Sequence, residues 1–224
     1  MSATDVLRKV PLFSDLSEVD LASFAEVMRE REYPKNSVIL FEDDPGDSLY
    51  IVSAGQVKVV LIGEDGREVI LSVLGDGDFF GEMALIDDEP RSAHVIAMKD
   101  AQLLVLRRDD FQAQVATHPQ IALKLLRVLV QRLRRADEKI GGLVLLDVNG
   151  RVARLLLDLA DESGGPKITR RLTHHTIAQM IGSSRETVSR AMRELVDRGL
   201  IETTRREISV KNREGLATLA GART

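Results

Sequence analysis

The alternation of apolar and polar positions changes character along the chain, and each stretch predicts a different kind of element. Apolar residues recur at helical spacing over 15–32, which predicts a short helix with Ser17 as its cap. From Ser37 to Leu106 the pattern changes to short β-branched runs separated by turn residues. After Pro119 the helical period returns and persists for about 25 residues, which predicts one long helix.

The middle stretch predicts an antiparallel β-roll. Its apolar runs are the expected strands, at residues 38–41, 49–52, 57–62, 69–74, 94–97 and 103–106. Glycines lie between the runs, and Glu64-Asp65-Gly66-Arg67 has the composition of a hairpin turn. Several short strands at nearly even spacing, with no long helix between them, are typical of an antiparallel barrel or a double-sheet roll.

The long helix has two apolar faces. The first has the alternating four- and three-residue spacing of a coiled-coil seam and consists of Ala122, Leu126, Leu129, Leu133, Ala136, Ile140 and Leu143. The second is formed by Leu125, Val128 and Val130. A helix that lies on its own domain needs one apolar face, whereas a second face allows it to pack on a partner as well. We therefore expect a homodimer that pairs through this helix.

The two halves of the chain differ in charge as well as in pattern. Asp147–Gly150 interrupts the long helix and can cap a new helix over 152–160, which places a boundary near 143–147. Residues 1–145 hold 17 Lys and Arg against 25 Asp and Glu, a formal charge of −8, while residues 146–224 hold 14 against 10, a charge of +4. An acidic half and a basic half suggest two tasks, and the basic half is suited to nucleic acid.

The basic half predicts a winged helix-turn-helix. Thr173 caps a helix that runs through Ile181, a tight turn follows at Gly182, and a second helix runs from Arg185 to about Arg198. The apolar spacing that two crossing helices need is present at Ala178, Ile181, Val188, Met192 and Leu195. A two-stranded hairpin, the wing, is expected from the segments 200–203, Arg205-Arg206 and 207–210.

The second of these helices carries side chains suited to DNA. Its donors and acceptors for base edges are Arg185, Glu186, Ser189 and Arg190. Arg can fork onto guanine and Glu can accept from cytosine. Ser184 and Thr187 lie near the positive end of the helix and are suited to phosphate oxygens. Thr173 is a further candidate DNA contact. Arg and Glu are also ordinary residues of a solvated helix face, but the turn glycine, the wing and the positive charge favour DNA binding.

A candidate anion site lies in the acidic half, in the segments Phe80–Leu85 and Pro90–Ala93. Its residues are Gly81, Glu82, Met83, Ala84, Arg91 and Ser92. Gly81 lets backbone N–H groups approach an anion, and a helical turn beginning near Glu82 points its positive end the same way. Arg91 can neutralise a phosphate with two parallel hydrogen bonds, Ser92 can add a donor, and Glu82 can accept from a ribose hydroxyl. These residue types are common in the loops of a β-roll, so by themselves they do not establish a nucleotide site.

Over nearly its whole length the chain resembles the CRP/FNR superfamily of bacterial transcription regulators. Phe80–Leu85 with Arg91-Ser92-Ala93 is similar to the phosphate-binding cassette of the cyclic-nucleotide-binding branch, residues 146–153 to its hinge, and residues 181–190 to its recognition helix. The resemblance implies that Glu82 holds a ribose hydroxyl and that Arg91 and Ser92 hold a cyclic phosphate. It also implies that base edges in the major groove are read by Arg185, Glu186 and Arg190.

The resemblance implies an α+β architecture in three parts. These are a β-roll effector-binding domain over 1–118, a dimerisation helix over 119–145, and a winged-helix DNA-binding domain over 146–224. It further implies an allosteric homodimer that binds a palindromic site on double-stranded DNA, with RNA polymerase as a further partner. The alternative is a regulator of the same family that binds DNA without an effector.

The resemblance favours cyclic AMP as the effector and leaves cyclic GMP and cyclic di-GMP open. In cyclic-AMP receptors of the family the long helix presents Thr-Ser to the adenine, whereas the matching positions are Ala136 and Asp137. An ionised Asp137 only accepts hydrogen bonds, and guanine offers two adjacent donors, so an Asp137 that faces the pocket favours a guanine nucleotide. An Asp137 that points to solvent leaves the base unread.

The composition excludes several other classes of function. The absence of Cys excludes a disulfide framework, a thiol nucleophile, an iron–sulfur cluster and a thiolate zinc site. No arrangement suited to haem or metal ligation is formed by His94, His118, His174 and His175. An enzyme acting on phosphate esters is disfavoured because no nucleophile or metal-ligand cluster accompanies the candidate anion site. No signal peptide and no run of about 18 apolar residues is present, which predicts a cytoplasmic protein without a membrane partner.

Overall fold

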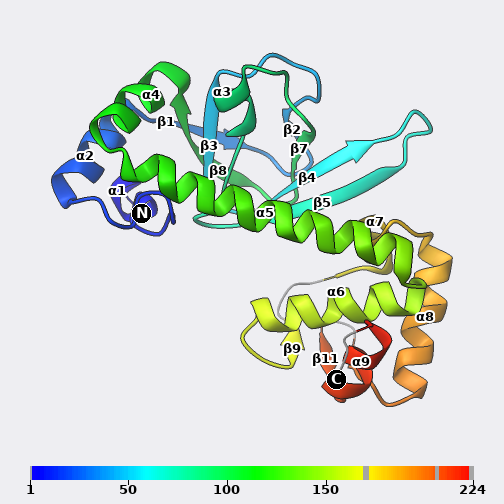
Figure 1. Cartoon of the computed structure of the whole chain (residues 1–224). Coiled ribbons are helices and arrows are strands. Elements are labelled where there is room, and N and C mark those ends of the chain that lie inside the picture. The colour runs from blue at the N-terminus through cyan, green and yellow to red at the C-terminus, as the bar shows by residue number, and fades with distance from the viewer. Residues whose placement is uncertain (1, 169–171, 205–206, 222–224) are drawn as a thin grey trace. The chain divides into compact units, whose positions relative to one another are not determined.

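The computed structural model describes residues 2–168, 172–204 and 207–221 (Figure 1). These residues form two compact units, one up to Arg132 and one from Leu133 onward. The first unit contains most of the strands, and the second is largely helical. The expected fold class is confirmed, with antiparallel sheets, a long helix and a C-terminal helix-turn-helix. The finer domain limits expected from the sequence stay a prediction.

Two four-stranded antiparallel sheets form the β-roll of the first unit. One has the strand order β1-β8-β3-β6 and consists of β1 (Arg29–Tyr33), β8 (Ala101–Arg107), β3 (Ser48–Ala54) and β6 (Phe79–Phe80). The other has the order β2-β7-β4-β5 and consists of β2 (Val38–Leu40), β7 (His94–Ala97), β4 (Val57–Ile62) and β5 (Glu68–Leu74). Buried residues of both sheets, among them Val52, Val57 and Leu103, share one apolar cluster. All six strands expected from the sequence are present, and β1 and β6 are additional.

The turn expected at Glu64–Arg67 joins β4 to β5. The Gly63 N–H donates to the Arg67 carbonyl at 2.9 Å, and Gly66 has a φ of +76°. This left-handed conformation suits glycine, which has no Cβ, so the predicted hairpin turn is confirmed.

The helices of the first unit pack around the roll. They are α1 (Ala3–Leu7), α2 (Glu18–Val27), α3 (Met83–Asp87), α4 (Arg108–Thr117) and the first part of α5 (Gln120–Leu145). Ser17 caps α2 as predicted, and it forms a capping box with Asp20. The expectation that this helix extends to residue 32 is wrong, because Met28 is extended and 29–33 pair with β8. The hydrogen bonds that β1 makes along the edge of the sheet outweigh the local helical pattern.

Helix α5 exposes the apolar seam in the single chain. Along it, the exposed fractions of Leu126, Leu133, Ile140 and Leu143 are 58%, 62%, 60% and 52%. On the second face Leu125 is buried in the first unit, but Val130 is exposed, contrary to expectation. Val130 follows Leu125 by five residues, which places it about 140° around the helix axis from Leu125 and therefore off that face. Neither this helix nor any other in the described residues is long and apolar enough to cross a membrane.

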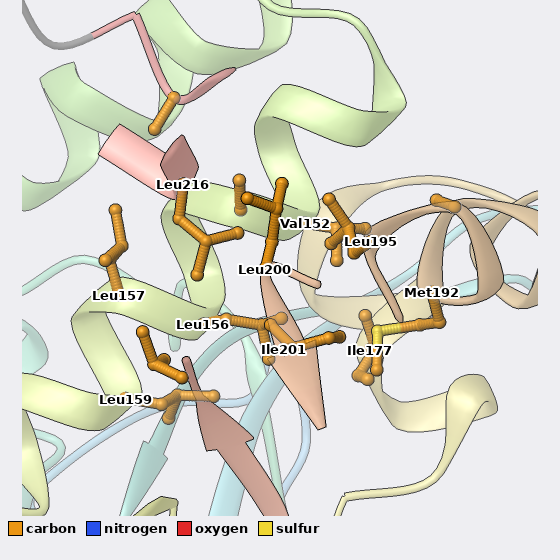
Figure 2. Packing of buried hydrophobic residues seen from close by; sticks show 14 of the residues in the cluster. Val152, Leu156, Leu157, Leu159, Ile177, Met192, Leu195, Leu200, Ile201 and Leu216 are labelled. Atoms are coloured by element: carbon orange, nitrogen blue, oxygen red, sulfur yellow. The ribbon is translucent and has the colours of Figure 1, made fainter. Parts of the chain in front are cut away.

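The second unit is a winged helix-turn-helix. It contains the last part of α5 and then α6 (Val148–Glu162), β9 (Lys167–Ile168), α7 (His174–Ile181), α8 (Arg185–Asp197), β10 (Ile201–Thr203), β11 (Ile208–Val210) and α9 (Arg213–Leu219). The three strands form an antiparallel sheet in the order β10-β11-β9. Figure 2 shows Val152 and Leu156 of α6 in one core with Ile177, Leu195 and Leu200.

The predicted helices and wing strands of this unit are present, α6 is longer than expected, and two further elements occur. The Asp147 side chain accepts from the Gly150 N–H at 2.8 Å, so α6 begins at Val148, earlier than expected. Strand β9 and helix α9 are additional elements. Arg205 and Arg206, expected in the wing, lie outside the described residues.

Candidate functional site

Two glycines make room for the side chain of Arg91. Gly81 has a φ of +83°, and a Cβ built on it would lie 2.8 Å from Arg91 Nη1 and 2.9 Å from the Ser48 carbonyl oxygen. A Cβ on Gly46 would lie 2.5 Å from Arg91 Nε. Distances this short are excluded for real side chains, so any other residue at either position displaces the guanidinium.

The Arg91 guanidinium is buried, with an exposed fraction of 5%. Its Nη1 donates to the Gly81 carbonyl at 2.9 Å and its Nη2 to the Ser48 carbonyl at 3.0 Å. It lies 5.8 Å from the centre of the Tyr50 ring, and its Nε is buried without a hydrogen-bond partner in the described structure. Burial lowers the pKa of Arg91 from its ordinary value, but a guanidinium still carries its proton in a protein. A buried cation with neutral acceptors and an unpaired N–H is suited to an anion.

Glu82, the predicted acceptor for a ribose hydroxyl, is paired with Arg132 of α5. Glu82 is 4% exposed, and its Oε1 accepts from Arg132 Nη1 at 2.7 Å. Arg132 Nη2 donates to the Phe79 carbonyl at 2.6 Å, and the guanidinium lies 4.7 Å from the centre of the Phe79 ring. Arg132 was not predicted as a site residue because it is one of several arginines on α5, and no local motif distinguishes it.

Arg108, also missed, joins the loop that contains Gly46 to helix α3. Its Nη2 donates to the Gly46 carbonyl at 2.7 Å and to the Ala84 carbonyl at 2.6 Å, and its Nη1 pairs with Asp88. Arg108 is the first residue of α4, a helix that the sequence pattern did not predict, and no local motif distinguishes this arginine.

The structure brings together the candidate residues of the roll. Helix α3 begins at Met83 directly after Glu82, as predicted, and Ala84 is buried. Ser92 is exposed, and its Oγ donates to Met83 Sδ at 3.6 Å. Ala136 and Asp137 are exposed on the part of α5 that belongs to the second unit. Their predicted role beside the base stays a prediction, as do the ligand contacts of the other residues.

In the helix-turn-helix, side-chain caps determine where each helix begins. The Thr173 hydroxyl accepts from the Thr176 N–H at 3.0 Å and so starts α7. Gly182 ends α7 with a φ of +63°, and the Ser184 hydroxyl accepts from the Thr187 N–H at 3.1 Å to start α8. The Ser184 and Thr187 hydroxyls lie 2.9 Å apart, so one hydrogen of the pair is used internally and the other can be donated outward.

One face of α8 is buried and the other is polar and open. The predicted core residues are confirmed as buried: Ala178, Ile181, Val188, Met192 and Leu195. The opposite face forms a shallow hollow that is lined by Arg185, Glu186, Ser189, Arg190 and Arg193. Arg193 was not predicted as a contact residue; its Nε donates to the Ser189 carbonyl at 3.2 Å. The hollow therefore presents three arginines, enough to contact polyanions such as DNA.

Within the described parts of the chain, no three His, Asp or Glu side chains are arranged to hold a metal ion. His94 accepts a hydrogen bond at Nδ1 from the Glu42 N–H, and His118 lies 3.7 Å from an Asp20 carboxylate oxygen. His174 and His175 are exposed at the start of α7.

Comparison with known proteins matches both units. Residues 30–118 match the family model of the cyclic nucleotide-binding domain, and residues 150–219 match that of the Crp-like helix-turn-helix domain. The chain is 34% identical over 221 residues to the CRP-like cAMP-activated global transcriptional regulator of Mycobacterium tuberculosis, covering 96% of this chain and 99% of the relative. It is 38% identical over 193 residues to the cyclic AMP receptor protein of Thermus thermophilus, covering 85% and 88%.

A solved structure with a similar fold is the c-di-GMP responsive global regulator CLP of Xanthomonas campestris. Its TM-score is 0.75 at 26% identity, covering 87% of this chain and 99% of that chain. These relatives are transcription regulators rather than enzymes.

Gly81→Ala should destabilise the roll more than Gly66→Ala does. Both glycines have a positive φ, but a Cβ on Gly66 meets nothing within 4 Å, whereas one on Gly81 meets Arg91. We expect Gly66→Ala to cost about 1–2 kcal/mol from the backbone alone. Gly81→Ala should cost roughly 1 kcal/mol or more beyond that, because the guanidinium must move. Denaturant unfolding of both variants measures the difference, and equal losses would contradict the close packing of Arg91 on Gly81.

Proposed function

Because the chain belongs to the CRP/FNR family of transcription regulators, we propose that it is a homodimer whose DNA binding is controlled by a cyclic nucleotide held in the β-roll. The observation that carries the proposal is the buried Arg91 guanidinium, whose Nε has no hydrogen-bond partner in the described structure. The match to the cyclic nucleotide-binding domain supports the class of effector. The match to the Crp-like helix-turn-helix supports binding to double-stranded DNA.

The charges at the site suit one phosphodiester. Arg91 and Arg132 carry two positive charges, and the buried Glu82 carboxylate carries one negative charge. Their sum of one positive charge balances the single negative charge of a cyclic mononucleotide. Arg91 would donate to the phosphate oxygens in place of the backbone carbonyls, and Ser92 would add a hydroxyl. A phosphate in place of the Gly81 and Ser48 carbonyls would give the buried Arg91 guanidinium an oppositely charged partner, which offsets the cost of its burial.

Arg132 offers a route from the effector to the long helix. Glu82, the proposed partner of the ribose hydroxyl, already contacts α5 through Arg132. A ribose hydroxyl that donates to Glu82 shares this carboxylate with the Arg132 guanidinium. Effector binding therefore changes the ion pair between Glu82 and Arg132, and Arg132 belongs to α5. An effector can shift DNA affinity only by binding the DNA-competent state better than the other state.

We propose cyclic AMP as the first effector to test. The relatives in Mycobacterium tuberculosis and Thermus thermophilus are named for cyclic AMP, whereas the structurally similar regulator of Xanthomonas campestris is named for cyclic di-GMP. The charge balance favours a monoanion over a cyclic dinucleotide with two phosphates. Asp137 favours guanine if it reads the base, because its carboxylate accepts from two adjacent guanine donors.

Replacement of Arg91 by Lys should weaken cyclic nucleotide binding about ten-fold or more. Lys keeps the charge but loses the two parallel donors that match a phosphate. Calorimetric titration with cyclic AMP, cyclic GMP and cyclic di-GMP measures the effect in both proteins. Arg67→Lys, on the exposed β4–β5 turn, is the matched control and should bind as the unchanged protein does.

Three results are informative, two from nucleotide titration of the Arg91→Lys and Asp137→Ser variants and one from DNA binding by the unchanged protein. Full affinity in Arg91→Lys removes Arg91 from the site. Tighter cyclic AMP binding by an Asp137→Ser variant supports base recognition at that position, and identical affinities contradict it. Tight DNA binding by a protein that binds no nucleotide favours the regulator that needs no effector.

Two residues of α8 should affect DNA binding in different ways. Arg185→Ala should cost about 1–3 kcal/mol and relax a preference for guanine in each half-site, since a forked pair with guanine is lost. Thr187→Ala should weaken binding to all sequences alike if its hydroxyl contacts phosphate. Competition binding with operator variants separates the two patterns, and the reverse pattern would show the roles to be misassigned. Arg213→Ala, on α9 and paired with Asp161, is the control and should change little.

The dimer should depend on the exposed seam of α5. Leu133 is 62% exposed in the single chain, and Leu133→Glu would place like charges together across a two-fold axis. We expect monomers that bind specific DNA weakly. Val19→Glu, at a 78% exposed apolar residue of α2 outside the seam, should leave the dimer intact. Sedimentation velocity distinguishes the variants, and an intact dimer in Leu133→Glu rules out the seam.

A further inference from the structure

The methionines of this protein differ in their exposure. The chain has six methionines and no cysteine, so methionine carries all of its sulfur. Met1 lies outside the described residues, and of the other five Met83 is exposed, with an exposed fraction of 49%. The others are half-buried or buried: Met28, Met98, Met180 and Met192.

Met83 contacts a hydroxyl of the proposed phosphate site. It is the first residue of α3, next to Glu82, and its Sδ accepts a hydrogen bond from Ser92 Oγ at 3.6 Å. Ser92 follows Arg91 and is exposed. A thioether sulfur is a weak acceptor, so Ser92 can turn from Met83 to a phosphate oxygen at little cost.

We propose that Met83 is an oxidation site through which a peroxide lowers the affinity of the roll for its cyclic nucleotide. The inference rests on the proposed function, namely that the site around Arg91 and Ser92 holds the phosphate. The Met83 sulfur attacks one oxygen of hydrogen peroxide, an S–O bond forms and the O–O bond breaks; the proton on the sulfur-bound oxygen passes to the departing hydroxide, which leaves as water. Sulfur loses two electrons and the peroxide gains them.

The sulfoxide changes what Ser92 contacts. Its oxygen carries partial negative charge and accepts hydrogen bonds much more strongly than a thioether does, so it retains the Ser92 hydroxyl. The phosphate of the nucleotide then loses the Ser92 hydroxyl as a donor, and the partial negative charge of the sulfoxide oxygen repels it. Loss of one hydrogen bond to a charged group corresponds to roughly a ten-fold or larger fall in affinity. Methionine sulfoxide reductases restore the thioether, so the effect is reversible.

The test follows oxidation and nucleotide binding in the full chain. The protein is treated with hydrogen peroxide, the oxidised methionines are mapped by mass spectrometry, and cyclic AMP is titrated by calorimetry before and after treatment. We expect Met83 to be oxidised faster than Met98, the affinity to fall roughly ten-fold, and methionine sulfoxide reductase to restore it.

Two variants separate Met83 from the other methionines. Met83→Leu should have the same affinity before and after peroxide, whatever its starting value. Met98→Leu, at a half-buried methionine outside the candidate site, should lose affinity on oxidation as the unchanged protein does.

Three results would overturn the inference alone, and a fourth would overturn the proposed function as well. An unchanged affinity with Met83 fully oxidised overturns the inference, and so does a loss in Met83→Leu equal to that in the unchanged protein. Oxidation of Met83 no faster than Met98 also overturns it and leaves the proposed function intact. If the untreated protein does not bind cyclic AMP, the test is made with cyclic GMP or cyclic di-GMP; if it binds none of the three, the proposed function fails and the inference fails with it.

Discussion

Burial of the Arg91 guanidinium is the constraint around which the candidate anion site of the roll is built. A buried cation requires close acceptors, and Arg91 finds them in the Gly81 and Ser48 carbonyls. Those carbonyls can approach because Gly46 and Gly81 have no side chains to obstruct the guanidinium. The buried Nε keeps an unsatisfied hydrogen-bonding capacity, which an anion can fill. The proposed ligand binding would account for a buried cation whose hydrogen-bond acceptors are neutral carbonyls.

The same region is tied to the long helix by a second charged group. Glu82 is buried and would be destabilising without a cation, and Arg132 of α5 supplies it. Arg132 is also fixed by the Phe79 carbonyl and ring, so its position depends on the strand that leads into Gly81. A ligand that changes the environment of Glu82 changes the partner of a residue on α5. Arg132 thus joins the helix that carries the exposed seam to the candidate anion site.

The DNA-binding unit relies on a different principle. Its α7 and α8 begin at hydroxyl caps, Thr173 and Ser184, and the turn between them needs the left-handed Gly182. Because these residues determine where each helix starts, they also determine that Val188 faces the core and Arg185 faces outward. The polar face of α8 follows from the helical period once its start is fixed.

The sequence alone determined the features that depend on local pattern. Strand runs, the Glu64–Arg67 turn, the caps and the apolar spacing of the helix-turn-helix depend on near neighbours, and a periodic pattern reports them directly. The tertiary structure decided what depends on distant partners. Strand β1 forms because β8 offers an edge. Arg132 contacts Glu82, which is 50 residues away in the chain, and Arg108 contacts Ala84, which is 24 residues away. Long-range hydrogen bonds and ion pairs leave no periodic signal in the sequence, so their partners emerge only when the chain has folded.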